Sequence, residues 1–109
     1  MARDTSSLAD LGLTAQAGRE AVITGLAVDS RFVKPGNLFA ALPGAKSHGG
    51  EFIQYALRMG AGAILTDREG AEIARAELSA SPAALVVAEE PRQALSMAAA
   101  LWFGHQPKT

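Results

Sequence analysis

Residues 26–44 read LAVDSRFVKPGNLFAALPG, a strand–turn–strand pattern that is the clearest structural signal in the chain. The turn falls at Pro35 and Gly36: proline presets φ at the first central position, and glycine supplies a positive φ at the second. Working outward, residues 21–29 are expected to form a strand before the turn. Residues 38–42 form a short apolar run, which fits a strand buried on both faces.

Strands and helices alternate beyond this stretch. We expect a helix that ends at Gly60, with Phe52, Tyr55, Ala56 and Met59 on its inward face. Further strands are expected over 61–66 and 84–88, a turn over 67–70, and helices over 5–13, 71–78 and from Pro91 to about Phe103. The alternation predicts an α/β fold: a single small domain with a mixed, partly parallel sheet flanked by helices.

Composition restricts the class of protein. The 109 residues are 49% hydrophobic and 19% charged, with a net charge of −1, which excludes an intrinsically disordered chain. The absence of cysteine excludes a disulfide scaffold and a thiolate zinc site. Near-zero net charge argues against a nucleic-acid partner, and neither a secretory signal nor a membrane span is visible. We therefore expect a cytoplasmic domain.

Two segments are candidates for ligand contact. Asp29-Ser30-Arg31 follows a strand, at the end where α/β sheets bind ligands, although Asp29 and Arg31 are equally suited to a structural pair or turn caps. The glycine-bearing loop 44–50 leads into a helix N-terminus, which can hold phosphate. A plain flexible loop is the simpler interpretation of the same residues, because 44–50 matches neither a Walker loop nor a GxGxxG fingerprint.

No nucleophile, base and orienting group come together in this sequence, so no catalytic residue is expected. His48 has no second histidine or cysteine nearby, so we expect a helix cap or a loop hydrogen bond there and no metal. Tyr55 and Trp102 lie on apolar helical faces and are expected to pack in the core. Residue chemistry alone therefore indicates a binding domain rather than a complete enzyme.

The stretch 26–44, continued by His48-Gly49 and by Gly60-Ala61 before an apolar strand, resembles the opening motif of the Mur ligase family. The Glu89–Leu95 segment and the ending Trp102–Pro107 also suit the family. The resemblance implies a fold like the family's N-terminal domain, with a lead-in over 1–24 and the domain itself over 25–104. Residues 105–109 would then begin a linker to an ATP-binding central domain.

In this family the N-terminal domain binds the UDP end of a nucleotide-linked muramoyl substrate used in peptidoglycan synthesis. Carried over by position, the substrate-binding residues are Val28, Ser30, Ala45, Lys46 and Ser47. The family commonly has aspartate in place of His48, which puts any contact there in question. ATP and Mg²⁺ are implied for a full-length parent and for none of these residues, and the central and C-terminal domains of the same chain are the implied partners.

Serine between Asp29 and Arg31 resembles the members that add the third amino acid to UDP-N-acetylmuramoyl-L-alanyl-D-glutamate, with meso-diaminopimelate favoured as the commoner case. The implied reaction is ATP-dependent amide formation through an acyl phosphate. Two alternatives stay open. One is the sister ligase that adds D-alanyl-D-alanine, which usually has threonine at that position; the other is a non-catalytic regulatory or interaction domain of related fold.

Overall fold

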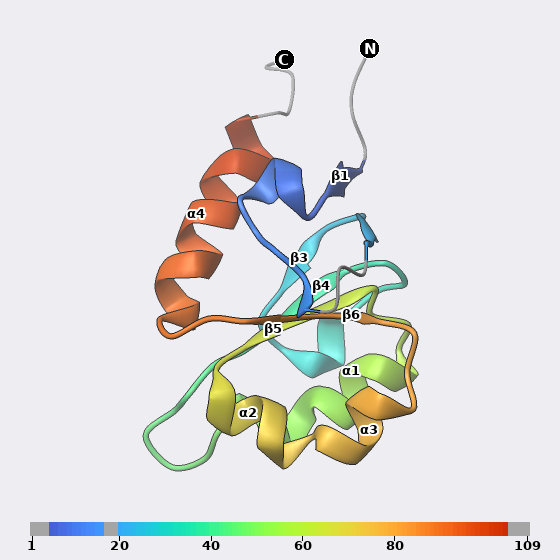
Figure 1. Cartoon of the computed structure of the whole chain (residues 1–109), viewed down its shortest axis with the longest axis vertical. Coiled ribbons are helices and arrows are strands. Elements are labelled where there is room, and N and C mark those ends of the chain that lie inside the picture. Colours follow the sequence, from blue (N-terminus) through green and yellow to red (C-terminus); the bar gives the residue numbers. More distant parts are fainter. Residues whose placement is uncertain (1–4, 17–19, 105–109) are drawn as a thin grey trace.

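A computed structural model describes residues 5–16 and 20–104 of the chain. Its centre is a sheet in which all neighbouring strands run parallel, in the order β3-β4-β5-β6 (Figure 1). These strands are β3 (Leu26–Ala27), β4 (Leu38–Ala41), β5 (Ala63–Thr66) and β6 (Ala84–Val87). The predicted α/β class, with a sheet flanked by helices, is confirmed. Antiparallel pairing occurs outside the four-stranded sheet, in a separate ribbon of β1 (Ser6–Ser7) and β2 (Val22–Ile23) and at the isolated bridge between Pro43 and His48.

Helices cover both faces of the parallel sheet. They are η1 (Ala9–Leu11), η3 (Ser30–Phe32), η4 (Gly49–Phe52), α1 (Ile53–Arg58), α2 (Arg68–Ile73), α3 (Arg75–Ser79) and α4 (Pro91–Gly104), where η denotes a 3-10 turn. Figure 1 shows α1, α2 and α3 on one face, and α4 with the blue N-terminal turn on the other. The result is three layers, with an apolar core on each side of the sheet. Within residues 5–16 and 20–104, every helix falls short of what a bilayer crossing requires.

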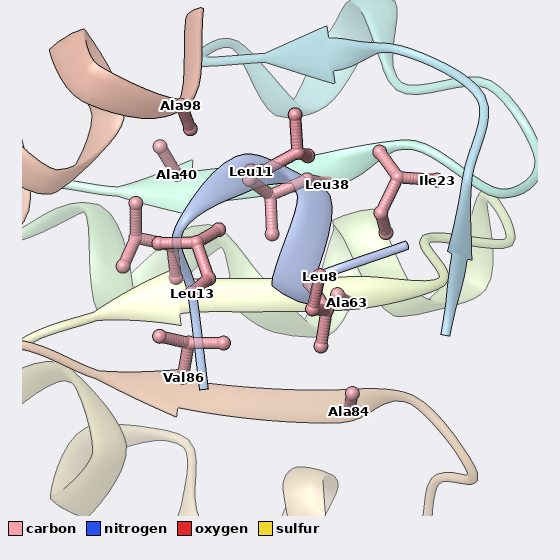
Figure 2. Close-up of a cluster of buried hydrophobic side chains, with 11 residues drawn as sticks. Leu8, Leu11, Leu13, Ile23, Leu38, Ala40, Ala63, Ala84, Val86 and Ala98 are labelled. Carbon is pink, nitrogen blue, oxygen red and sulfur yellow. The ribbon is translucent and has the colours of Figure 1, made fainter. Parts of the chain in front are cut away.

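Side chains of the central strands alternate between the two cores, as the pleat requires. Leu38 and Ala40 of β4 face α4 and η1, in the cluster drawn in Figure 2. Phe39 and Ala41 face α1 instead. All four residues of β4 are buried, so the prediction of a strand buried on both faces is confirmed.

The expected single strand over 21–29 is wrong, because the chain passes from one sheet to the other within it. Thr24 is held by the turn that follows: its N–H donates to the Gly36 carbonyl at 3.1 Å, and its hydroxyl donates to the Pro35 carbonyl at 2.8 Å. These bonds separate β2 from β3. The turn itself is as predicted, with φ of +85° at Gly36 and Asn37 N–H donating to the Lys34 carbonyl at 2.9 Å.

The expected inward face of the helix ending at Gly60 is also corrected. Phe52, Tyr55 and Met59 are 43%, 47% and 48% exposed, whereas Ile53 and Ala56 are fully buried. The reason is that a 3-10 turn, η4, precedes α1, and its tighter winding shifts the phase of the apolar positions. Gly60 does end the helix, with φ of +96°.

The segment over 67–78 also departs from expectation. Residues 67–70, predicted as a turn, include the first turn of α2, with Asp67 as its N-cap. The helix expected over 71–78 is divided at Ala74, which is buried, whereas Ile73 is 43% exposed.

The first described residues form a 3-10 turn rather than the expected helix over 5–13. The Ser7 hydroxyl accepts from Asp10 N–H at 3.1 Å beside the start of this turn. Leu8 and Leu11 are buried and pack with Ile23 against the sheet (Figure 2). Residues 5–16 and 22–23, which lie within the expected lead-in, therefore contribute to the core on the α4 side. The expected linker at 105–109 lies outside the described residues.

Candidate functional site

A cleft of about 980 Å³ lies at the carboxyl ends of β3 and β4, between η3 and α1. This is the edge at which open parallel sheets commonly bind ligands. Its walls come from three segments and its floor from β4. The lining residues are Val28, Asp29, Ser30 and Arg31; Leu42, Ser47 and Gly49; Phe52, Tyr55, Arg58 and Met59; and Phe39 and Ala40.

The first wall is the turn after β3, which is built around an ion pair. The Asp29 carboxylate accepts from Arg31 N–H at 2.9 Å and caps η3, and it also binds the Arg31 guanidinium, with Nη2 at 2.7 Å. Hydrogen bonds from the Arg31 side chain and backbone lower the pKa of Asp29 to about 2. Both structural roles weighed for this pair, turn cap and ion pair, are present.

Ser30 lies within this turn, between the two paired residues. Its side chain lines the cleft and is partly exposed. Within residues 5–16 and 20–104 its hydroxyl has no hydrogen-bond partner, so it is available to a ligand as both donor and acceptor. Val28, which precedes the turn, is 61% exposed and lines the same wall.

The second wall is the loop between β4 and η4, seen in Figure 1 beside α2. Of its three candidate residues, Ser47 lines the cleft, whereas Ala45 and Lys46 are exposed farther along the loop and do not line it. The base of the loop is fixed, because Gly49 N–H donates to the Leu42 carbonyl at 2.7 Å. Arg92 of α4 also donates from Nη2 to the Pro43 carbonyl.

The third wall, on α1, was missed by sequence reasoning. The ring centroids of Phe52 and Tyr55 are 6.5 Å apart, and the Arg58 guanidinium lies 5.8 Å from the centre of the Tyr55 ring. The expected packing of Tyr55 in the core is wrong, because this residue is 47% exposed. No signal in helical spacing identifies these residues, because the phase of the helix depends on η4.

His48 acts as a helix cap, as predicted, and also makes a contact that the sequence did not reveal. Its Nδ1 accepts from Gly50 N–H at 2.7 Å, and the Glu51 carboxylate accepts from His48 N–H at 3.4 Å, which completes a capping box. Its Nε2 lies 2.7 Å from Oδ1 of Asp67, the N-cap of α2. The cap that aspartate would supply at position 48 is therefore supplied by histidine.

His48, Asp67 and Glu69 hold donor atoms within 4.8 Å of one another, the kind of grouping that can bind a metal ion. Both ring nitrogens of His48 are already engaged, Nδ1 by a backbone N–H and Nε2 by a carboxylate. Partial burial alone raises the pKa of Asp67, but hydrogen bonds from Gly70 N–H and His48 outweigh it, so this pKa is lowered. The group is thus a hydrogen-bonded network between two helix caps.

These features are typical of one class of protein, the α/β ligand-binding domains: the cleft combines a free hydroxyl with apolar and aromatic walls, and the loop beside it carries a lysine. The model of the family described as Mur ligase family, catalytic domain, matches residues 22–103. The chain belongs to the Mur ligase family.

Similarity to named relatives agrees with this assignment. The chain is 48% identical over 101 residues to the UDP-N-acetylmuramoyl-L-alanyl-D-glutamate--2,6-diaminopimelate ligase of Streptomyces coelicolor, covering 92% of the chain and 19% of that relative. It is 36% identical over 107 residues to the ligase of the same name from Mesorhizobium japonicum, covering 98% and 20%. The chain thus spans about a fifth of the length of these relatives.

The fold also matches solved structures of the family. A crystal structure of MurF from Acinetobacter baumannii superposes with a TM-score of 0.64 at 17% identity, covering 91% of this chain and 21% of that one. At this identity the likeness concerns the fold alone.

Proposed function

We propose that this chain is the N-terminal domain of an ATP-dependent amide ligase and binds the UDP end of UDP-N-acetylmuramoyl-L-alanyl-D-glutamate, to which the parent enzyme adds meso-diaminopimelate. One observation carries the proposal: Val28, Ser30 and Ser47, each a substrate-binding residue by family resemblance, line one cleft at the carboxyl ends of parallel strands. The names of relatives up to 48% identical support the choice of amino acid. A cytoplasmic location is part of the same proposal.

The domain's contribution would be to bind and orient. In the proposed parent reaction, ATP phosphorylates the D-glutamate carboxylate to an acyl phosphate, and the incoming amine displaces phosphate through a tetrahedral intermediate. Holding the nucleotide end of the substrate supplies binding energy remote from the reacting carboxylate, which helps to position it. ATP and Mg²⁺ would act outside this domain, because the 109 residues contain no G-x-x-x-x-G-K-[ST] phosphate loop.

The cleft offers suitable partners for each part of a uridine nucleotide. The Ser30 hydroxyl can bond a base or ribose edge, and Tyr55 and Phe52 offer ring faces for stacking. Lys46, next to Ser47 on the same loop, would supply a mobile positive charge for the diphosphate.

Calorimetric titration of the 109-residue chain with UDP and with CDP tests the proposal. We expect UDP to bind and CDP to bind more weakly, because the two differ at the base edge. Ser30→Ala should weaken UDP binding by about 0.5–1.5 kcal/mol, the loss of one neutral hydrogen bond. Arg75→Ala, on the exposed face of α3, is the matched control and should not change it.

The outcomes separate the alternatives. A regulatory or interaction domain would ignore UDP, and absence of binding by the folded chain contradicts the proposal. If UDP binds and Ser30→Ala binds it equally well, the serine has only a structural role in the turn. The dipeptide-adding sister ligase shares the nucleotide, so it is distinguished by which amino acid or dipeptide the complete enzyme accepts.

A further inference from the structure

We propose that the hydrogen bond between His48 and Asp67 is a positioning link that holds the loop over 43–47 in its ligand-binding conformation; this rests on the proposed function of the cleft. Neither residue lines the cleft, so both would act through the loop. The link joins elements far apart in sequence, since His48 ends the loop and Asp67 begins α2.

The hydrogen bonds fix the state of the histidine. Gly50 N–H can only donate, so His48 Nδ1 must present its lone pair at this 2.7 Å contact. The proton of the neutral ring then lies on Nε2, where it is donated to Asp67 Oδ1 at 2.7 Å. One imidazole thus caps η4 through one nitrogen and binds α2 through the other.

The Asp67 carboxylate likewise serves two elements, the loop and α2. Asp67 Oδ1 accepts from His48 Nε2 and also from Gly70 N–H at 2.8 Å, so a single oxygen caps α2 and receives the loop. The His48 side chain is 6% exposed and that of Asp67 is 20% exposed, so water competes little for this bond. A side chain at position 48 that caps η4 without reaching Asp67 would leave the end of the loop attached to η4 and to the Leu42 carbonyl, but no longer to α2.

The helical turns η4 and α2 pack closely beside the His48–Asp67 bond because each has a glycine at the contact, Gly50 and Gly70. A Cβ on Gly50 would lie 2.8 Å from Gly70 Cα, and one on Gly70 would lie 2.8 Å from His48 Cε1. The imidazole therefore lies directly against α2, and η4 and α2 meet at their backbones. Because the two turns approach this closely, the link ties the position of the loop to that of α2.

Substitutions can remove the link while keeping each cap. His48→Asn retains an oxygen for Gly50 N–H but is too short to reach Asp67, and Asp67→Ser likewise retains the α2 cap. Asp67→Asn is the conservative control, because the asparagine side chain has the same length and its amide oxygen can still accept from His48 and from Gly70 N–H. The single variants and the double variant form a cycle in which loss of one shared bond is non-additive.

The first measurement is amide hydrogen exchange of Gly49, whose N–H donates to the Leu42 carbonyl at the base of the loop, in the ligand-free 109-residue chain, with ¹⁵N shifts of the His48 ring. We expect a protonated Nε2 in the wild type, and faster exchange of the Gly49 amide for His48→Asn and Asp67→Ser than for the wild type. The exchange of β4 and β5 amides should stay unchanged, which separates loop release from general loss of stability.

The second measurement is UDP affinity by calorimetry. Each link-breaking variant should bind UDP roughly 3- to 10-fold more weakly, the effect of one hydrogen bond, with Asp67→Asn within about 2-fold of the wild type. The double variant should lose no more than either single variant. If Gly49 exchange and UDP affinity are unchanged in His48→Asn, the positioning link is overturned. If the wild type shows the expected exchange pattern yet does not bind UDP, the proposed function fails instead.

Discussion

Lys46 stands apart from the other candidate residues because it is on the loop but not in the cleft wall. A lysine in this place acts as a mobile charge whose effect is screened by salt. We expect Lys46→Ala to weaken UDP binding by about 1 kcal/mol or less at physiological salt, more at low salt, and to leave uridine binding nearly unchanged. Calorimetry with both ligands at two salt concentrations measures this.

Lys34→Ala provides the matched control for Lys46→Ala. It removes the same charge from an exposed lysine, but in the turn that precedes β4, at the opposite edge of the sheet from the cleft. Its effect on UDP affinity should be much smaller. Equal losses for UDP and uridine in Lys46→Ala, independent of salt, would mean that Lys46 supports the loop rather than contacting the diphosphate.

Asp67 should make the domain sensitive to acid. Its pKa is lowered in the folded state, so its stabilising contribution is present above the unfolded pKa of about 3.9 and is lost as pH falls through the folded value. The difference in unfolding free energy between the wild type and Asp67→Asn should therefore be largest near neutral pH and shrink below about pH 4. Urea denaturation from pH 7 to acid measures it.

Asp29 also has a lowered pKa, so any stabilising contribution of its carboxylate would likewise be lost as the pH falls. It is present in both proteins of that comparison, so its effect cancels. A difference between the wild type and Asp67→Asn that stays constant down to the lowest pH measured would show that the Asp67 carboxylate gains nothing from its two hydrogen bonds.

At the scale of elements, the packing of α2 against Thr66 of β5 and against His48 leaves no room for a side chain at Gly70. A Cβ there would lie 1.9 Å from Thr66 Oγ1, which is itself committed to the Ala41 carbonyl at 2.9 Å. We expect Gly70→Ala to destabilise the domain by about 1–3 kcal/mol, because overpacking outweighs the gain of up to about 1 kcal/mol in helix propensity.

Gly104→Ala is the control for that substitution. Gly104 ends α4 and a Cβ there meets nothing within 4 Å, so its unfolding free energy should change by less than about 0.5 kcal/mol. Chemical denaturation of both variants makes the comparison. An unchanged or raised stability of Gly70→Ala would show that α2 can move away from η4 at little cost.

The elements that the sequence predicted well depend on local chemistry. The three longer strands, β4, β5 and β6, are continuous apolar runs, and the turn at Gly36 requires a positive φ, so each has a short-range signal. The division of 21–29 into β2 and β3 has no such signal. It depends on Thr24 bonding to the Pro35 and Gly36 carbonyls, a contact that exists only after the turn has folded.

The candidate site was predictable to a similar extent. Ser30 follows a strand and Ser47 precedes a helical turn, so sequence order places both at the carboxyl edge of the sheet. Tyr55 and Arg58 were missed because their exposure depends on the helical phase that η4 sets. The His48–Asp67 bond was missed because it joins residues 19 apart through tertiary packing.

At the scale of the whole molecule, the two faces of the sheet have different tasks. The α4 face packs η1 and the described residues of the N-terminal segment into one apolar cluster. The α1 face adjoins the cleft, and its helices are short and held by caps at His48 and Asp67. Both faces of the sheet therefore contribute apolar core, whereas the cleft adjoins one of them only.

The 109 residues by themselves are expected to bind a nucleotide without catalysing the ligase reaction. The sequence has no Walker phosphate loop, and the cleft between η3 and α1 has no nucleophile paired with a base among its lining residues. We therefore expect the purified chain to bind UDP yet release no ADP from ATP when UDP-N-acetylmuramoyl-L-alanyl-D-glutamate and meso-diaminopimelate are present. A coupled assay for ADP measures this, with UDP binding by the same preparation as the proof of folding. ADP release that follows the chain through purification would contradict a purely substrate-binding domain and require an ATP site among these residues.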